Sequence, residues 1–148
     1  LTRRVVKAAN AYRASGGRNN NAALCALKDL DAWASLGALS RIENDKAYDT
    51  QGKTIAGLAL SYLQFRDAGL DQSKRRRTVA WLAAMADDLA RYVSASRGKS
   101  ARNNHRYWSG LGVAAAGVVA DRRDLVAWGI ESARIGLRQV GADGTLPL

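Results

Sequence analysis

Two segments of the chain are so poor in polar side chains that neither can form an ordinary surface helix. Residues 53–66 contain "KTIAGLALSYLQF", where Ser61 and Gln64 are the only polar side chains after Thr54, and residues 104–120 end in the apolar run "GLGVAAAGVVA". A helix that is apolar around its circumference must be covered by other elements. Both segments are shorter than the ~20 apolar residues that span a bilayer. We therefore expect two buried helices lying side by side, and no membrane insertion.

Three further segments alternate with these two along the chain and are amphipathic. Each has apolar residues at helical spacing with charged side chains opposite; they span about 22–39, 75–95 and 122–140, after a short amphipathic lead-in that ends at the loop "SGGRNNN". Proline occurs only at Pro147, so no proline interrupts these helices. Asp121 is expected to cap the last of them.

The alternation of outer and inner helices predicts the architecture. Short connections make successive helices antiparallel neighbours. A plain four-helix bundle would make every helix similarly amphipathic, and a regular solenoid would show a sequence repeat. We therefore predict an all-α fold: an α/α toroid, or incomplete α/α barrel, of antiparallel helix hairpins in inner and outer layers. Residues 1–148 are expected to form a single domain.

Basic side chains outnumber acidic ones, with 23 Lys and Arg against 13 Asp and Glu and a net charge of +10. This charge attracts a polyanion without distinguishing nucleic acid, an anionic membrane and an acidic polysaccharide. A nucleic-acid partner is disfavoured, because no helix has a clean basic recognition face. The run "KRRR" at 74–77 is interpreted first as a solvated helix start and second as an element that steers a polyanion.

The chain has one cysteine, Cys25, within the apolar run "AALCAL". A lone cysteine cannot form an intrachain disulfide, and the spacing of a Cys/His zinc site is absent, so we expect neither a metal nor a cofactor. The apolar neighbours predict that Cys25 belongs to the core. The same is expected of four aromatic residues at helical spacing, namely Trp33, Tyr62, Trp81 and Trp128.

The hexapeptide "NNHRYW", residues 103–108, stands at the start of the second apolar helix and holds the only histidine. Free backbone amides and the helix dipole favour an anion at such a place. A capping role for Asn103 and a structural role for His105 explain part of the pattern. The other side chains suit a charged sugar: Asn104 and His105 offer directed donors, Arg106 offers a fork for a carboxylate, and Tyr107 and Trp108 offer faces for sugar rings.

This hexapeptide resembles the "NNHxYW" motif of the polymannuronate-type alginate lyases, polysaccharide lyase family 5. The resemblance continues downstream through "DRRDLVAWGIESARIGLRQVGADGTLP" and upstream in "CALKDLDAWASLGAL" and "GKTIAGLALSYL". It implies an α/α toroid, β-elimination on mannuronate-rich alginate, and a periplasmic or secreted setting. The chain is expected to be the central portion of the catalytic domain, with a monomer favoured.

The resemblance also implies roles for the site residues. Elimination removes a weakly acidic proton next to a carboxylate, so the carboxylate charge must be neutralised first. Asn104 and His105 match the family's neutralising pair, and His105 is also a candidate for assisting proton transfer. The family's catalytic Arg and Tyr follow the "GxLP" turn, so they are expected beyond Leu148. Tyr107 is not expected to replace that tyrosine, since it already matches a position within the motif.

The remaining candidates for substrate binding lie near the first apolar helix. Arg41, Gln51 and Lys53 stand at or near helix ends that could line the cleft, and they join Asn103, Arg106, Tyr107 and Trp108 as expected substrate-binding residues. The alternative function is a non-catalytic helical domain that binds a polyanion or carbohydrate. A basic nucleic-acid-binding module is the less favoured alternative.

Overall fold

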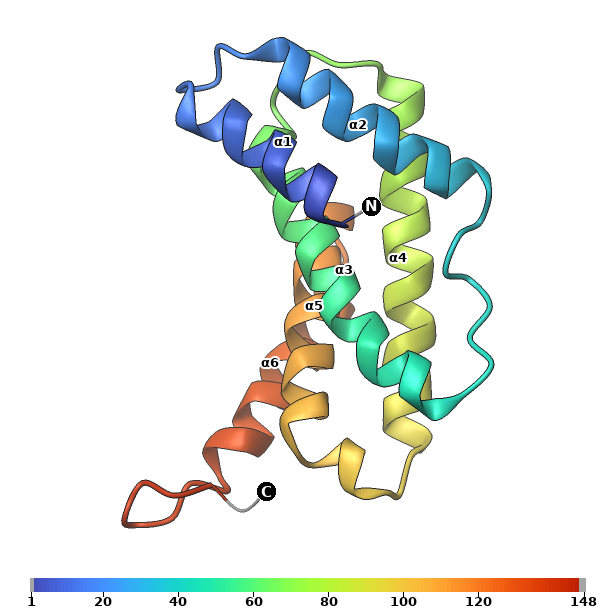
Figure 1. Ribbon diagram of the computed structural model, residues 1–148. Coiled ribbons are helices and arrows are strands. Elements are labelled where there is room, and N and C mark those ends of the chain that lie inside the picture. The colour runs from blue at the N-terminus through green and yellow to red at the C-terminus, as the bar shows by residue number, and fades with distance from the viewer. Residues whose placement is uncertain (1, 147–148) are drawn as a thin grey trace.

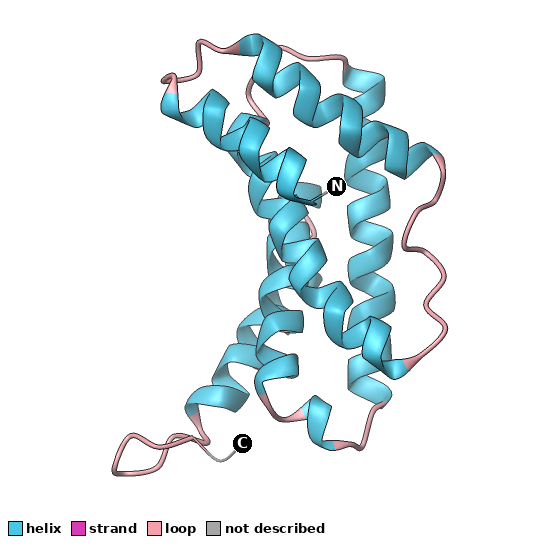
Figure 2. Cartoon of the chain, viewed as in Figure 1, coloured by secondary structure: helices cyan, strands magenta, loops and turns pink. Residues whose placement is uncertain are grey.

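The computed structural model describes residues 2–146, apart from the side chains of Asp45 and Ser100, and its regular structure there is entirely helical (Figure 2). The predicted all-α class is therefore confirmed. None of the described helices is long and apolar enough to cross a membrane. The helices are α1 (Thr2–Ala14), α2 (Asn20–Ser35), α3 (Asp45–Phe65), α4 (Gln72–Ala95), the short 3₁₀ helix η1 (Lys99–Ala101), α5 (Asn104–Ala120) and α6 (Arg123–Leu137).

The helices form antiparallel hairpins in two layers. In Figure 1, α3 and α5 run side by side in the same direction. Helix α4, which connects them in the sequence, runs in the opposite direction, and α6 runs back along α5. The α1–α2 hairpin packs over one end, with α1 against α3 and α2 against α4. The two apolar segments are thus neighbouring inner helices, as predicted, and α4 and α6 belong to the outer layer.

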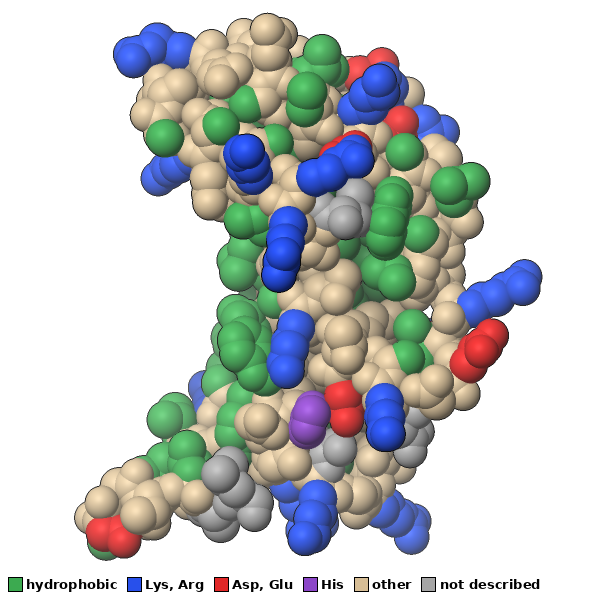
Figure 3. Space-filling view, in the orientation of Figure 1, with side chains coloured by type: hydrophobic (Ala, Val, Ile, Leu, Met, Phe, Trp, Pro, Cys, Tyr) green, Lys and Arg blue, Asp and Glu red, His purple; other side chains and the backbone are tan. Residues whose placement is uncertain are grey.

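The inner helices are not surrounded on every side, contrary to the prediction. Their apolar side chains Leu60, Trp108, Leu111 and Val118 are each 43–47% exposed. Figure 3 shows hydrophobic side chains gathered along the hollowed edge of the molecule, where α3 and α5 run in Figure 1. We call the surface around these four residues the concave face. The remaining sides of α3 and α5 supply much of the core, including Ile55, Leu58 and Val113.

Helix α5 has the predicted bounds, whereas α3 begins eight residues earlier than predicted. The early start follows from Asn44, whose side chain accepts a hydrogen bond of 3.0 Å from the amide of Ala47. Such an N-cap satisfies one of the free amides of the first turn. The lead-in is a complete helix, α1. The basic run at 74–77 does begin a helix, because Asp71 caps α4 through the amide of Lys74.

Two local predictions are wrong. Cys25 is exposed, because the buried side of α2 is set by Ala23, Ala26 and Leu30 and leaves Cys25 facing away. Asp121 does not cap α6; its backbone adopts φ of 53° and ends α5 in the left-handed conformation. The core aromatic residues are as predicted: Tyr62 and Trp81 are buried, while Trp33 and Trp128 are partly buried against the core. In the "GxLP" turn, Pro147 lies outside the described residues.

The contact between α3 and α5 depends on glycine. A Cβ on Gly112 would overlap the carbonyl oxygen of Gly52, and a Cβ on Gly52 would lie 2.9 Å from the Cα of Ser109. Backbone atoms cannot move aside as a flexible side chain can. The two helices therefore approach as closely as their backbones allow only because both positions lack a side chain.

Substitution Gly112→Ala should lower the stability of the fold by about 1–3 kcal/mol, because overpacking the helix contact outweighs the gain of up to about 1 kcal/mol in helix propensity. The matched control is Gly69→Ala, since no atom lies within 4 Å of a Cβ there. Urea unfolding of both variants measures the difference. Equal stability of the two variants would contradict close packing at Gly112.

Candidate functional site

The hexapeptide 103–108 forms the start of α5. The side chain of Asn103 accepts a hydrogen bond of 3.0 Å from the amide of His105, so Asn103 is the N-cap. This cap ties up one amide of the first turn and directs the chain into the helix. Asn104, the first helical residue, is exposed. His105 follows it on the neighbouring side of the turn and is partly buried.

His105 faces Asp49 of α3. Its Nδ1 atom lies 3.4 Å from Oδ1 of Asp49, with the two side chains 31% and 27% exposed. Nδ1 is buried and makes no hydrogen bond of normal geometry within the described residues. The Asp49 carboxylate is therefore the charged group that faces this nitrogen, and Nε2 is left as the nitrogen available to a ligand. A carboxylate in this place orients an imidazole and selects which nitrogen carries the proton.

A second pair lies one helical turn further along the same two helices. The ammonium group of Lys53 is 5.8 Å from the centre of the Trp108 ring, within reach of a cation–π contact. Residues 49 and 53 are one turn apart on α3, and residues 105 and 108 are about one turn apart on α5. The two helices thus present parallel rows of side chains. Figure 3 shows the histidine at the surface with an acidic side chain beside it.

Two stacked tyrosines support Asp49 from the side of α4. The rings of Tyr48 and Tyr92 are parallel, with centroids 3.7 Å apart, and the Tyr48 hydroxyl donates to Asp88 at 3.0 Å. Burial, followed by this hydrogen bond, raises the pKa of Tyr48. Together with His105 and Ser109 these rings line a cavity of about 10 Å³, which is close to the space of one water molecule. The stack fixes the first turns of α3, and with them the position of Asp49.

Arg106 and Tyr107 turn toward α6. Arg106 is 8% exposed, donates from Nε to the hydroxyl of Ser132 at 2.8 Å, and lies 4.2 Å from the centre of the Trp128 ring. Burial lowers the pKa of this guanidinium. The Tyr107 hydroxyl donates to Gln139 at 2.7 Å. Arg106 thus joins α5 to α6, Tyr107 joins α5 to the turn after α6, and neither is brought together with His105.

Of the three predicted substrate-binding residues that precede α5, only one lies beside the hexapeptide. Lys53 reaches Trp108, as described. Gln51 is buried and donates to the carbonyl oxygen of Leu39 at 3.2 Å, which anchors the loop before α3. Arg41 lies in that loop with an exposed side chain and makes no hydrogen bond or ion pair with the described residues. The structure therefore groups Asn103, Asn104, His105, Lys53 and Trp108 on one surface, which we call the α5 site.

Asp49 belongs to the α5 site and was not predicted from the sequence. It lies one turn before Lys53, ahead of the helix predicted to begin at about residue 53. The N-cap Asn44 is the sequence signal that places it on a helix. Within residues 2–146, no three His, Cys, Asp or Glu side chains come together in a way that could hold a metal ion.

Comparison with known proteins finds a family model and several relatives that are all described as lyases. The family model described as alginate lyase matches residues 2–148. A polysaccharide lyase of Stenotrophomonas maltophilia is 35% identical over 131 residues, covering 86% of this chain and 39% of its own length. An alginate lyase of Azotobacter vinelandii is 35% identical over 129 residues, covering 83% of this chain and 34% of its own length.

Solved structures confirm the toroid. A His-to-Ala variant of alginate lyase A1-III complexed with a tetrasaccharide superposes with a TM-score of 0.89 at 25% identity, covering 98% of this chain and 42% of that one. A Tyr-to-Phe variant of the same enzyme, also with a tetrasaccharide, gives a TM-score of 0.84 at 27% identity. The chain thus spans between about a third and about two fifths of the length of these relatives. Since the family model covers it from residue 2 to residue 148, the chain belongs to the alginate lyase family.

Proposed function

We propose that the protein carrying this chain is a lyase that cleaves mannuronate-rich alginate by β-elimination, and that residues 1–148 are the central part of its α/α toroid domain. The observation that carries the proposal is the α5 site: a histidine held against Asp49 at the start of an inner helix, on one surface with Asn104, Lys53 and Trp108. Family membership and the tetrasaccharide complexes of the structural relatives support the substrate class.

The first requirement of the reaction is to neutralise the uronate carboxylate. The proton to be removed is on the ring carbon next to that group, and its loss creates a dianionic, enolate-like state. Donors aimed at the carboxylate stabilise this state more than the ground state, and one good donor is worth roughly 2.7–4 kcal/mol in comparable sites. We assign this role to Asn104 and His105, where the N-terminal dipole of α5 adds a favourable potential.

The contact with Asp49 decides what His105 can do. Because Nδ1 faces the carboxylate at 3.4 Å, Nε2 is the nitrogen that meets the substrate. When protonated, Nε2 donates to the uronate carboxylate; when neutral, it can accept the ring proton. Trp108, with Lys53 beside it, presents an exposed aromatic face on which a sugar ring can stack next to a positive charge. We propose the same substrate-binding role for Asn103, through the helix start that it caps.

We also propose that the protein acts as a monomer in the periplasm or outside the cell. The reason for this location is that the proposed substrate is a charged polymer too large to pass a membrane. Detection of the protein in the cytoplasmic fraction alone would contradict this location.

Variants Asn104→Ala and His105→Ala should each reduce turnover by about 10²-fold or more, because each removes a donor to a charge that grows in the transition state. Thermal stability should change little, since Asn104 is exposed and His105 is partly exposed. The assay is the ultraviolet absorbance of the unsaturated uronate formed from polymannuronate, in the complete polypeptide. The control is Asn10→Ala on the exposed side of α1. Wild-type turnover with a lowered melting temperature would instead mean that these residues are only structural.

Substitution Asp49→Asn should change the tautomer of His105. In the native chain we expect the neutral ring to carry its proton on Nδ1, facing the carboxylate, and in the variant to shift toward the Nε2-protonated form. The chain has one histidine, so ¹⁵N NMR of labelled imidazole reports on His105 alone. Asp67→Asn, at an exposed position in the turn after α3, is the control. An unchanged tautomer in Asp49→Asn would remove Asp49 from the site.

Binding of polymannuronate should weaken strongly as salt rises, because a net charge of +10 attracts the polymer through screened electrostatics with a Debye length of about 10 Å at 0.1 M salt. Equilibrium binding at increasing NaCl measures the effect. A neutral glucan of the same length is the control and should not bind. Equal affinity for both polymers would show that charge does not select the partner.

A further inference from the structure

A basic surface separate from the α5 site lies at the opposite end of α5 from His105. It is a pocket of about 690 Å³ between the end of α3, the first half of α4 and the end of α5. The α5 residues at the pocket, Val119 and Ala120, are about 14 residues beyond His105, which corresponds to about 20 Å along the helix. This volume is within the range of pockets that hold small molecules. We call it the arginine pocket.

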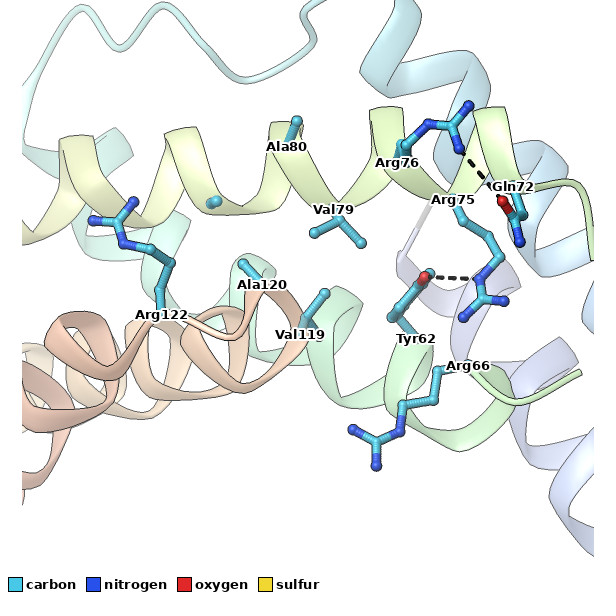
Figure 4. A pocket seen from close by; sticks show the side chains of 11 residues that line it. Tyr62, Arg66, Gln72, Arg75, Arg76, Val79, Ala80, Val119, Ala120 and Arg122 are labelled. Carbon is cyan, nitrogen blue, oxygen red and sulfur yellow. Dashed lines mark hydrogen bonds between the residues drawn. The ribbon is translucent and has the colours of Figure 1, made fainter.

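Four arginines line the arginine pocket and no acidic residue does. Figure 4 shows Arg66 and Arg75 at one end of the pocket and Arg122 at the other end. Arg75 donates to the Tyr62 hydroxyl at 3.4 Å, and Arg76 turns to Gln72 at 3.5 Å. Neither guanidinium has a carboxylate as its hydrogen-bond partner in the described structure.

The other two arginines do meet carboxylates. Arg122 is held by Asp87 at 3.0 Å and by Asp124 at 2.6 Å, so much of its charge is already balanced. Arg66 lies 3.7 Å from Asp67, a contact between side chains that are 49% and 89% exposed and therefore weak. The uncompensated charge of the pocket is thus concentrated at the end where Arg66, Arg75 and Arg76 lie.

The floor of the arginine pocket is apolar. Val79, Ala80, Ala83, Val119 and Ala120 line it between the arginines. A compact, highly charged anion such as a phosphate would use one group of arginines and gain nothing from this floor. A chain with charges spaced along it and apolar ring faces between them would use both. Guanidinium forks match the planar oxygens of carboxylates.

We propose that the arginine pocket is a second, non-catalytic site for an acidic oligosaccharide with uronate carboxylates, separate from the α5 site. The proposal rests on the proposed function for the identity of its ligand, since a lyase of this substrate class meets such chains. A site about 20 Å from the reacting sugar holds a distant part of the same polymer, or a released product, near the enzyme.

The test is the stoichiometry of binding of a mannuronate tetrasaccharide, measured by isothermal titration in the complete polypeptide. All proteins carry His105→Ala so that the ligand is not consumed. We expect two equivalents to bind. Adding Arg66→Gln and Arg75→Gln should weaken binding at the arginine pocket by at least about tenfold, so that only one equivalent of tetrasaccharide is detected. The matched control removes the same charge from two exposed arginines outside the pocket, with Arg3→Gln and Arg97→Gln, and should keep two equivalents.

The remaining outcomes are distinct. The arginine pocket is overturned if the protein binds one equivalent and the pocket variant still binds it. It is also overturned if the protein binds two equivalents and the pocket variant still binds both. One equivalent that the pocket variant abolishes supports the arginine pocket, and it means that loss of the His105 side chain has weakened binding at the α5 site. Binding of inorganic pyrophosphate at the pocket without binding of the tetrasaccharide overturns the assignment to an acidic sugar. Because Arg75 contacts Tyr62, the single variant Arg66→Gln, at a half-exposed position, gives the same comparison if the double variant does not fold.

Discussion

The close contact of α3 with α5 is the constraint on which the α5 site depends. Gly52 and Gly112 let the two backbones touch, and Asp49 and His105 lie on the same helices within two turns of that contact. Asp and His have short side chains, so they can meet at 3.4 Å only where the helices themselves are close. The same approach brings Lys53 to Trp108. The packing that builds the inner layer thus also sets the geometry of the site.

Much of this arrangement could be predicted from the sequence because the pattern is local. The apolar run after Ser109 and the cap at Asn103 together determine α5, and both signals lie within the segment itself. The first turns of α3 lack such a run, since Tyr48 and Asp49 are typical of a loop as much as of a helix. The meeting of Asp49 with His105 joins residues far apart in the chain, and its geometry is set by a helix crossing that no local pattern specifies.

The position of Arg106 could have been predicted from the helical spacing of the residues after it. Its role was instead inferred from the chemistry of its guanidinium group alone. It lies on the same helical stripe as Gly110, Val113 and Gly117, all of which are buried. That spacing places its side chain toward α6, where it packs on Trp128 and donates to Ser132. A guanidinium fork beside a candidate anion site suggested a carboxylate partner, yet the helical period carries the better information about which side chains can reach a ligand.

Because most of α5 is apolar, the side chains of this helix that can form hydrogen bonds are confined to its N-terminal end. From Gly110 to Ala120 the helix has no polar side chain, so its exposed positions Leu111 and Val118 offer a sugar ring an apolar surface and no hydrogen bond. Directed donors on α5 are confined to its first two turns, around Asn104 and His105. A uronate chain lying along this helix would therefore meet the hydrogen-bond donors of α5 itself at one ring only. Charge recognition concentrated at one position is what an elimination reaction needs, because it must change the acidity of one carbon without binding every carboxylate of the polymer equally tightly.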